Sequence, residues 1–407
     1  MGQYSCERNS EKKYERISGE LSGELNETSL IEALEELKER KEIEEHYVKS
    51  TIDWDELPDT LTLYVEHYEL ARIVNEARDI VGPKELEKED IMSNTLQQEV
   101  VYGNKETITV GKLKLLLDIV GIPHDEMNIF IYGIGDPGNP YTINNPRLPF
   151  NFDSEAGGIV LAAALKDGTI HKEEAKGYWF AYYNKDEKNR ERVKEAVRKV
   201  FGDVEPHESK ERNEISYHSY AIVSALEKMG APIGEKVEQD YHVPQVVRMG
   251  SESVKRAYLH QTFMDEGSWS PDGSNFKYPQ AGALDPSKLS EDDKRYFEGL
   301  LNKQKEYPTG YTYHYVYLSE ELGKEIREEY PRVWAVIEGS KPPFLEEEMD
   351  ILEEMCGVRP EPKPREIYTT TEGDYRVSWR VEISKKEEWN RVRERLRLPR
   401  DKHRHEG

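Results

Sequence analysis

Cysteine is nearly absent from this chain. Its 407 residues include two cysteines, Cys6 and Cys356, which lie far apart in the sequence. This scarcity excludes a framework of disulfide bonds and a zinc site built from cysteine pairs. It is typical of proteins from a reducing compartment, so we expect a cytoplasmic protein.

Long apolar runs are also missing. No segment approaches the roughly 18–20 apolar residues that a membrane-spanning helix needs, and the mean hydropathy is −0.85. The first 20 residues contain no apolar core of the kind found in secretory signals. The sequence therefore predicts a protein without a membrane segment.

Positively charged residues are outnumbered by negatively charged ones, 57 against 81. The net charge is −24, which argues against nucleic-acid binding because phosphate contacts need clustered lysine and arginine. The charge is uneven, however. Residues 1–140 carry a net −16, whereas residues 363–407 carry a net +4. The net charge of the whole chain is therefore a poor guide to the local field.

The N-terminal third is predicted to be helical. Residues 1–60 are interpreted as a polar helical arm and linker, with an exposed helix at 30–45. Residues 61–130 predict a helical domain, which is either a helix-turn-helix unit or a plain helical bundle. The predicted helix at 93–103 carries no lysine or arginine, which favours the bundle. Residues 131–152 are rich in Gly, Pro and Asn and predict a loop linker.

From residue 153 onward, one order of elements occurs twice: helix, two strands, helix, two strands, helix. In the first copy, residues 153–245, the first helix ends at Asp167-Gly168. In the second copy, residues 246–400, it ends at Glu266-Gly267, and residues 309–319 predict the aromatic strand of the first pair. The second copy contains an insertion at about 270–308, and a basic tail follows at 401–407.

The two acid-glycine helix ends resemble the motifs of the LAGLIDADG homing endonuclease family. The matching stretches are "VLAAALKDG" (160–168) and "LHQTFMDEG" (259–267), and the resemblance covers residues 150–400. It implies an α+β fold of two tandem αββαββα repeats with pseudo-twofold symmetry, whose antiparallel sheets form a saddle. It also implies a monomer in which the two motif helices pack side by side between the repeats.

The resemblance assigns the catalytic and metal-binding roles to Asp167 and Glu266, with Mg²⁺ or Mn²⁺ as the cofactor. Two carboxylates suit phosphodiester hydrolysis because they hold divalent ions that position water and stabilise the leaving oxygen. At each motif, the glycine (Gly168 or Gly267) would let the chain pass from helix to strand, through unusual backbone angles or a close backbone approach. In the second motif, residues 260–262 replace the family's small residues, so we expect looser packing there.

Candidates for nucleic-acid contacts follow from the same resemblance. A basic residue from the sheet usually assists catalysis in this family, and three lysines are candidates: Lys172, Lys176 and Lys277. Strand alternation sends one parity of side chains toward the nucleic acid without fixing which. The candidates in the first copy are Tyr178, Phe180 and Tyr182, and in the second copy Tyr368, Thr370, Arg376, Ser378 and Arg380. We expect Trp179 and Trp379 to be core residues.

Three functions remain open at this point. The first is a site-specific, metal-dependent endonuclease that cleaves double-stranded DNA. The second is a catalytically inactive DNA-binding regulator with the same fold, in which residues 67–123 would read the DNA. The third is an RNA maturase, for which structured RNA would be the partner.

Overall fold

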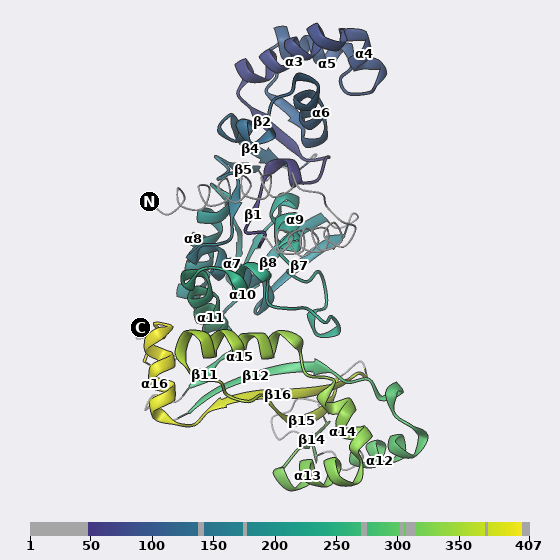
Figure 1. Ribbon diagram of the computed structural model, residues 1–407, viewed down its shortest axis with the longest axis vertical. Helices are drawn as coiled ribbons and strands as arrows, with labels where there is room; N and C mark the ends of the chain where they lie inside the picture. The colour runs from purple at the N-terminus through teal and green to yellow at the C-terminus, as the bar shows by residue number, and fades with distance from the viewer. Residues whose placement is uncertain are drawn as a thin grey trace, which may run out of the picture. The chain divides into compact units, whose positions relative to one another are not determined.

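The computed structural model describes residues 48–136, 142–173, 177–269, 275–301, 305–306, 314–370 and 373–400 (Figure 1). The predicted helix at 30–45 and the basic tail at 401–407 lie outside this range. From Lys49 onward the chain forms one compact unit. It combines helices with antiparallel sheets, which confirms the mixed composition expected from the sequence. No described helix is both long and apolar enough to span a lipid bilayer.

Residues 49–151 form a mixed domain rather than a helical one. Its antiparallel sheet has the order β3 (Thr107–Thr109), β2 (Thr62–Val65), β4 (Ile131–Gly135) and β5 (Thr142–Asn144). Its helices are α3 (His67–Val81), α4 (Pro83–Lys88), α5 (Asn94–Tyr102) and α6 (Val110–Val120). The prediction of a purely helical unit at 61–130 and a loop at 131–152 is therefore wrong. β-Branched residues such as Ile108 and Ile134 favour strands, and each pairs with Leu63 of β2.

The predicted helix-turn-helix is interrupted by a strand. β3 lies between α5 and α6 and pairs with β2, so these two helices are not joined by a simple turn. Gln97 of α5, which would lie on the DNA-reading helix under the helix-turn-helix alternative, is fully buried. Its side-chain amide donates to the carbonyl oxygens of Pro83 and Met92, each at 3.0 Å. α5 thus carries core contacts at this position.

The predicted linker at 53–60 belongs to the same domain. β1 (Thr51–Ile52) pairs with β6 (Phe150–Asn151), and the short 3-10 turn η1 (Trp54–Glu56) follows. Trp54 is fully buried, and its indole donates to the carbonyl oxygen of His124 at 3.1 Å, where the turn η2 (His124–Ile129) begins. The acidic residues of this stretch hide the signal of a buried tryptophan.

The first repeat has the predicted order of elements. Its elements are α7 (Glu155–Leu165), β7 (Gly168–Glu173), β8 (Gly177–Tyr183), α8 (Glu187–Phe201), β9 (His207–Ser209), β10 (Glu214–Tyr217) and α9 (Tyr220–Lys228). The four strands form an antiparallel sheet in the order β7-β8-β10-β9. The short turn η3 (Lys236–Glu238) then leads toward the second repeat.

The second repeat has the same order with a large addition. Its common elements are α10 (Gln245–Met249), α11 (Glu252–Glu266), β11 (Ser268–Trp269), β12 (Phe276–Ala283), α15 (Pro343–Cys356), β15 (Lys363–Thr369), β16 (Tyr375–Ile383) and α16 (Lys386–Arg395). The added elements are η4 (Pro286–Lys288), α12 (Glu291–Leu301), β13 (Lys305–Glu306), β14 (His314–Tyr317), α13 (Glu320–Glu329) and α14 (Pro331–Glu338). All strands join one sheet of order β11-β12-β16-β15-β14-β13, and α15 runs along it (Figure 1).

The predicted position of the insertion is wrong. β12 at 276–283 lies inside the predicted insertion and is itself the second strand of the repeat. The aromatic strand predicted at 309–319 corresponds to β14, which belongs to the added segment between β12 and α15. The sequence "KYPQAGA" of β12 misled the prediction because proline, glycine and alanine are weak strand formers.

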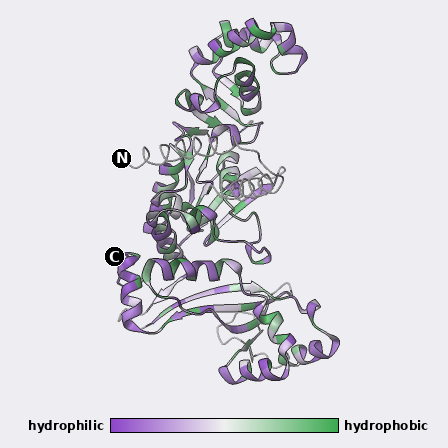
Figure 2. Ribbon diagram, in the orientation of Figure 1, coloured by the Kyte–Doolittle hydropathy of each residue, from purple (hydrophilic) through white to green (hydrophobic). Residues whose placement is uncertain are grey.

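Figure 2 shows hydrophilic residues along much of α13 and α16.

α7 and α11 pack along one another and join the two repeats. α7 is apolar on every side, with alanine at 162–164, and nearly all of it is buried. Gly158 is a point of close approach: a Cβ at this position would lie 2.5 Å from the carbonyl oxygen of Val254 on α11. The small residues of α7 therefore permit a backbone contact that a larger side chain would block.

Candidate active site between the repeats

Each motif glycine lies between the end of its motif helix and the strand that follows. Gly168 opens β7 and pairs with Tyr182 of β8, while Gly267 lies between α11 and β11. A Cβ on Gly168 would lie 2.4 Å from the carbonyl oxygen of Ala163, and one on Gly267 would lie 2.7 Å from that of Phe263. Of the two reasons expected for glycine, close backbone approach is the one that applies at both positions.

Asp167 lies beside a buried carboxylate from the other repeat. The side-chain amide of Asn184, just after β8, donates to Asp167 at 3.0 Å and to Asp265 at 3.2 Å. Tyr182 donates its hydroxyl to Asp265 at 2.6 Å, and Gln261 donates its amide to the same oxygen at 2.9 Å. Burial raises the pKa of Asp265 well above its usual range, and the negative charge of Asp167 raises it further. The two carboxylates therefore form one coupled group.

Asp265 of the second repeat contacts the first repeat, and Lys166 of the first repeat contacts the second in the same way. It holds the same position in the first motif as Asp265 in the second, two residues before the glycine. Its ammonium lies 2.7 Å from Glu348 of α15, and both side chains are almost completely buried. Tyr258 and Tyr278 donate their hydroxyls to Glu348 at 2.8 Å and 2.6 Å. Each motif therefore inserts one charged side chain into a tyrosine-containing cluster of the opposite repeat.

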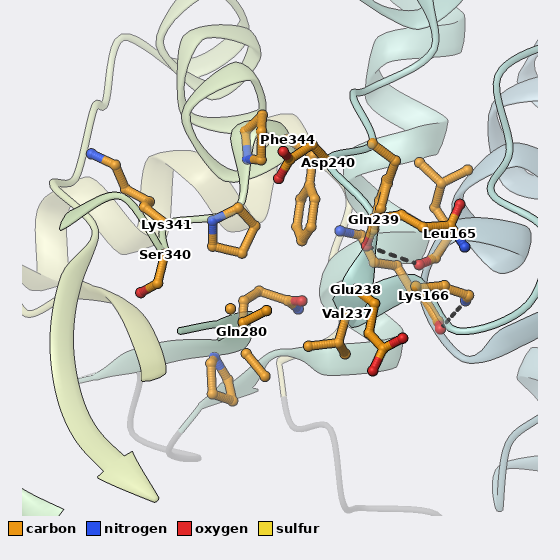
Figure 3. Close-up of a pocket in the computed structure, with 18 of the residues that line it drawn as sticks. Leu165, Lys166, Val237, Glu238, Gln239, Asp240, Gln280, Ser340, Lys341 and Phe344 are labelled. Atoms are coloured by element: carbon orange, nitrogen blue, oxygen red, sulfur yellow. Dashed lines mark hydrogen bonds between the residues drawn. The ribbon is translucent and has the colours of Figure 1, made fainter. Parts of the chain in front are cut away.

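Glu266 lines a different cavity from Asp167. A cavity of about 290 Å³ contains Glu266 and Lys236 in its wall, and Figure 3 shows residues 237–240 facing Lys341 and Phe344 across it, with Gln280 between them. Asp167 instead lines a cavity with Asn184 and Asp265. The structure therefore pairs Asp167 with Asp265 and places Glu266 with Lys236.

Lys236 is a candidate functional residue that sequence reasoning missed. Its ammonium donates to the carbonyl oxygen of Lys166 at 2.7 Å. Burial lowers its pKa to about 7 and nearby Lys166 adds to that effect, against the opposing charges of Glu266, Asp167 and Asp265. The residue lies in the polar connection between the repeats, where no sequence motif marks it. Its neighbours come from both motif helices, so only the folded chain brings them together.

The side chains of both cavities offer oxygen atoms, which suit a hard divalent cation. Asp167 and Glu266 each supply one carboxylate to a separate cavity, and Asn184 adds an amide beside Asp167. Among the described residues, no group of three or more histidine, cysteine, aspartate or glutamate side chains is arranged to hold a metal ion. A site with one or two carboxylates, completed by water and phosphate oxygens, fits Mg²⁺, which commonly keeps several waters.

Five of the predicted nucleic-acid contacts lie on one face of the second repeat's sheet. The pairings Lys277–Glu382, Arg380–Pro279 and Arg376–Tyr368 place these side chains on the same face, because directly paired residues and alternate residues share a side. Ser378 shares the face by alternation. Trp379 points the other way and is fully buried, with its indole donating to Ser340 at 3.2 Å. The prediction that Trp379 is a core residue is confirmed.

The first repeat differs from expectation. Lys172 shares a face with Tyr178, Phe180 and Tyr182, and it pairs with Glu227 of α9 at 2.6 Å. The helix-covered face thus holds the residues proposed for nucleic-acid contact. Trp179, predicted to be in the core, is half-buried on the opposite face, where it stacks on His171. Lys176 lies outside the described residues.

No protein-family profile matches the chain, and no curated protein sequence matches it either. Among solved structures, mesophilic variants of the homing endonuclease I-DmoI are similar over 62% of this chain and 100% of theirs, with 11% identity and a TM-score of 0.32. The homing endonuclease I-WcaI, bound to its DNA recognition sequence, is similar over 60% of this chain and 80% of its own, with 9% identity and a TM-score of 0.26. Because both TM-scores are low, the function of this chain is argued from its own residues.

Proposed function

We propose that this chain is a site-specific endonuclease that cleaves both strands of duplex DNA with the help of a divalent metal ion, Mg²⁺ or Mn²⁺. The observation that supports the proposal is the packing of α7 against α11, which leaves one acid-glycine helix end from each repeat at the boundary between two repeats of one architecture. An internal pair of repeats suits a nearly symmetric duplex without requiring a second chain.

Asp167 and Glu266, which line separate cavities, would each contribute one carboxylate to metal binding. A bound divalent ion supplies positive charge for the scissile phosphate and activates water for hydrolysis. Asn184 orients the Asp167 carboxylate through its 3.0 Å hydrogen bond. Lys236, whose pKa is lowered to about 7, can exchange a proton near neutral pH beside the Glu266 cavity.

The second repeat's open sheet face is assigned to phosphate binding. Lys277, Arg376 and Arg380 supply cations there, although Arg376 and Arg380 also lie 3.4 Å and 3.5 Å from Glu238 and Glu382. Binding DNA would exchange these carboxylates for phosphates, so affinity should fall steeply with salt.

The experiment that tests the proposal is a cleavage selection. A randomised duplex library is incubated with the protein in Mg²⁺ or Mn²⁺, and in parallel with a chelator, and the broken ends are sequenced. We expect double-strand breaks in one class of sequence, only with metal. Specific binding without breaks in either metal would favour the second candidate, a DNA-binding regulator. The buried Gln261 and Thr262 in the second motif helix give that candidate its support, since both depart from the small residues of the resembled motif.

A further inference from the structure

A row of aromatic rings crosses the first repeat's sheet on the face opposite α9. His171 of β7 stacks on Trp179 of β8, with ring centroids 4.3 Å apart and an interplanar angle of 20°. Trp179 lies 6.1 Å from His218, which follows β10, at 25°, and His218 lies 6.4 Å from His207 of β9. Thr169 lies 3.4 Å from the Nε2 of His171. The row, His171–Trp179–His218–His207, spans all four strands.

This face differs sharply from that of the second repeat. By pairing and alternation its described strand residues are Thr169, His171, Glu173, Trp179, Ala181, Tyr183, His207, Ser209, Glu214 and Ser216. None of these strand residues is lysine or arginine. The second repeat's face instead carries Lys277, Arg376 and Arg380. Within the described strands, positive charge on the first face can therefore come only from its histidines.

We propose that the aromatic row is a pH-responsive half of the DNA-binding surface. Above neutral pH its uncharged rings contact base edges and sugars, and in mildly acidic solution its histidines bind phosphates. The identity of the partner as duplex DNA rests on the proposed function. It agrees with the charge pattern, because the second face supplies the fixed cations that a polyanion needs and the first face supplies titrating ones.

The geometry supports this division. His171 and Trp179 are half-buried while His207 is exposed, so the row presents ring edges and polar ring nitrogens without being sealed in the core. The ring nitrogens of histidine and the indole N–H of tryptophan are hydrogen-bonding groups, and the base edges in the grooves of a duplex offer donors and acceptors to them. A protonated His171 would also gain a cation–π contact with the Trp179 face.

Other titratable or charged groups lie around the row. They are Glu173 at the end of β7, Tyr183 at the end of β8, Glu214 of β10, and Lys210, Glu211 and Arg212 in the turn before it. Glu208 of β9 is of the opposite parity to His207 and pairs with Lys194 at 2.8 Å. Burial lowers the pKa of His218, neighbouring His207 lowers it further, and Glu214 opposes both.

The experiment measures the binding of a mixed-sequence duplex, without added metal, at about pH 5.5 and about pH 8, each over a range of salt. We expect binding to weaken by about tenfold or more on going to the higher pH. The slope of log K against log salt should be steeper at the lower pH by about 0.9 for each phosphate that a histidine engages. The His171→Gln/His207→Gln/His218→Gln variant should lose both differences. If this variant does not fold, His171→Gln alone decides by the same readouts.

Two further variants complete the design. Arg376→Gln/Arg380→Gln should weaken binding at both pH values while keeping the pH dependence, because it alters the other face. Trp179→Phe isolates the emission of Trp179, which we expect to be quenched by added duplex and by protonation of the rings beside it. DNA affinity that does not change with pH, together with Trp179 emission that does not change when duplex is added, would overturn the inference. Neither result would contradict the endonuclease proposal. Binding that follows pH and the histidines, without cleavage in any metal, would overturn the endonuclease proposal alone.

Discussion

The hydroxyl of Tyr182 donates to the carboxylate of Asp265 at 2.6 Å, across the boundary between the two repeats. Tyr182 pairs with the first motif glycine, and Asp265 lies two residues before the second. Together with the Lys166–Glu348 pair at 2.7 Å, this contact fixes the two motif helices to the opposite repeats.

Tyr182→Phe should destabilise the protein. It removes one hydrogen bond to a fully buried carboxyl group, and the loss of such a buried partner costs about 1–3 kcal/mol. The matched control is Tyr217→Phe, because Tyr217 is buried in the same sheet and its hydroxyl makes no hydrogen bond within the described part of the chain. Urea unfolding of the two variants measures the difference. An equal effect of both substitutions would contradict the role of the Tyr182–Asp265 contact.

Lys166→Met should be costly alone and tolerated in combination. The single change leaves Glu348 buried without its cation and should cost about 3–5 kcal/mol. Lys166→Met/Glu348→Gln removes both charges. Its amide oxygen accepts from one of the two tyrosine hydroxyls and its N–H can donate to the other, so the double variant should regain most of the lost stability. A double-mutant cycle from thermal unfolding checks this. Additive effects of the two substitutions would show that the ion pair has no coupling.

Gly158→Ala should loosen the packing of α7 on α11. Its methyl group would meet the carbonyl oxygen of Val254 at 2.5 Å, and overpacking of this kind costs about 1–3 kcal/mol. Gly299→Ala in α12 is the control, since its Cβ would meet no atom within 4 Å and the change should stabilise by about 0.5–1 kcal/mol. Denaturation midpoints of the two variants should move in opposite directions. A stabilised Gly158→Ala protein would contradict the close helix contact.

Lys236→Met should stabilise the metal-free protein in a pH-dependent way. The folded-state pKa of Lys236 is about 7, below the ordinary lysine value of 10.5, so the unfolded chain binds more protons between these values. Stability of the wild type therefore rises with pH across this window. The gain from Lys236→Met should be largest below pH 7 and vanish above about 10.5. Thermal unfolding across this range, with and without the substitution, tests the sign. A gain that grows with pH would contradict it.

The repeated part of the fold was predictable from sequence because its signals are local. Apolar helices that end on an acid and a glycine, followed by alternating strands, locate α7 and α11 and the strands of the first repeat. The fold of the N-terminal domain was not predictable from the sequence. Its strands "IYGIG" and "TIT" are short, and their partner β2 lies up to about 70 residues away. Pairing over such distances leaves no periodic signal in a single segment.

The site was predictable only in its motif positions. Asp167 and Glu266 were found because each stands before a motif glycine. The sequence did not reveal the roles of Asp265, Asn184 and Lys236. These roles depend on contacts between segments that are 17 to 98 residues apart. The parity of the sheet faces was also out of reach, because "GYWFAYY" is apolar on both sides and the helices decide which side is covered.

The most direct test of the central claim is strand-resolved cleavage of a duplex recovered from the selection, by the wild type, Asp167→Asn, Glu266→Gln and the double variant. Asp240→Asn is the matched control, because Asp240 is a carboxylate of the same cavity as Glu266 and lies outside the motif helix. We predict that the wild type and the control cut both strands, and that the double variant binds the duplex but cuts neither. Cleavage by the double variant at the wild-type rate would contradict the assignment of these two carboxylates.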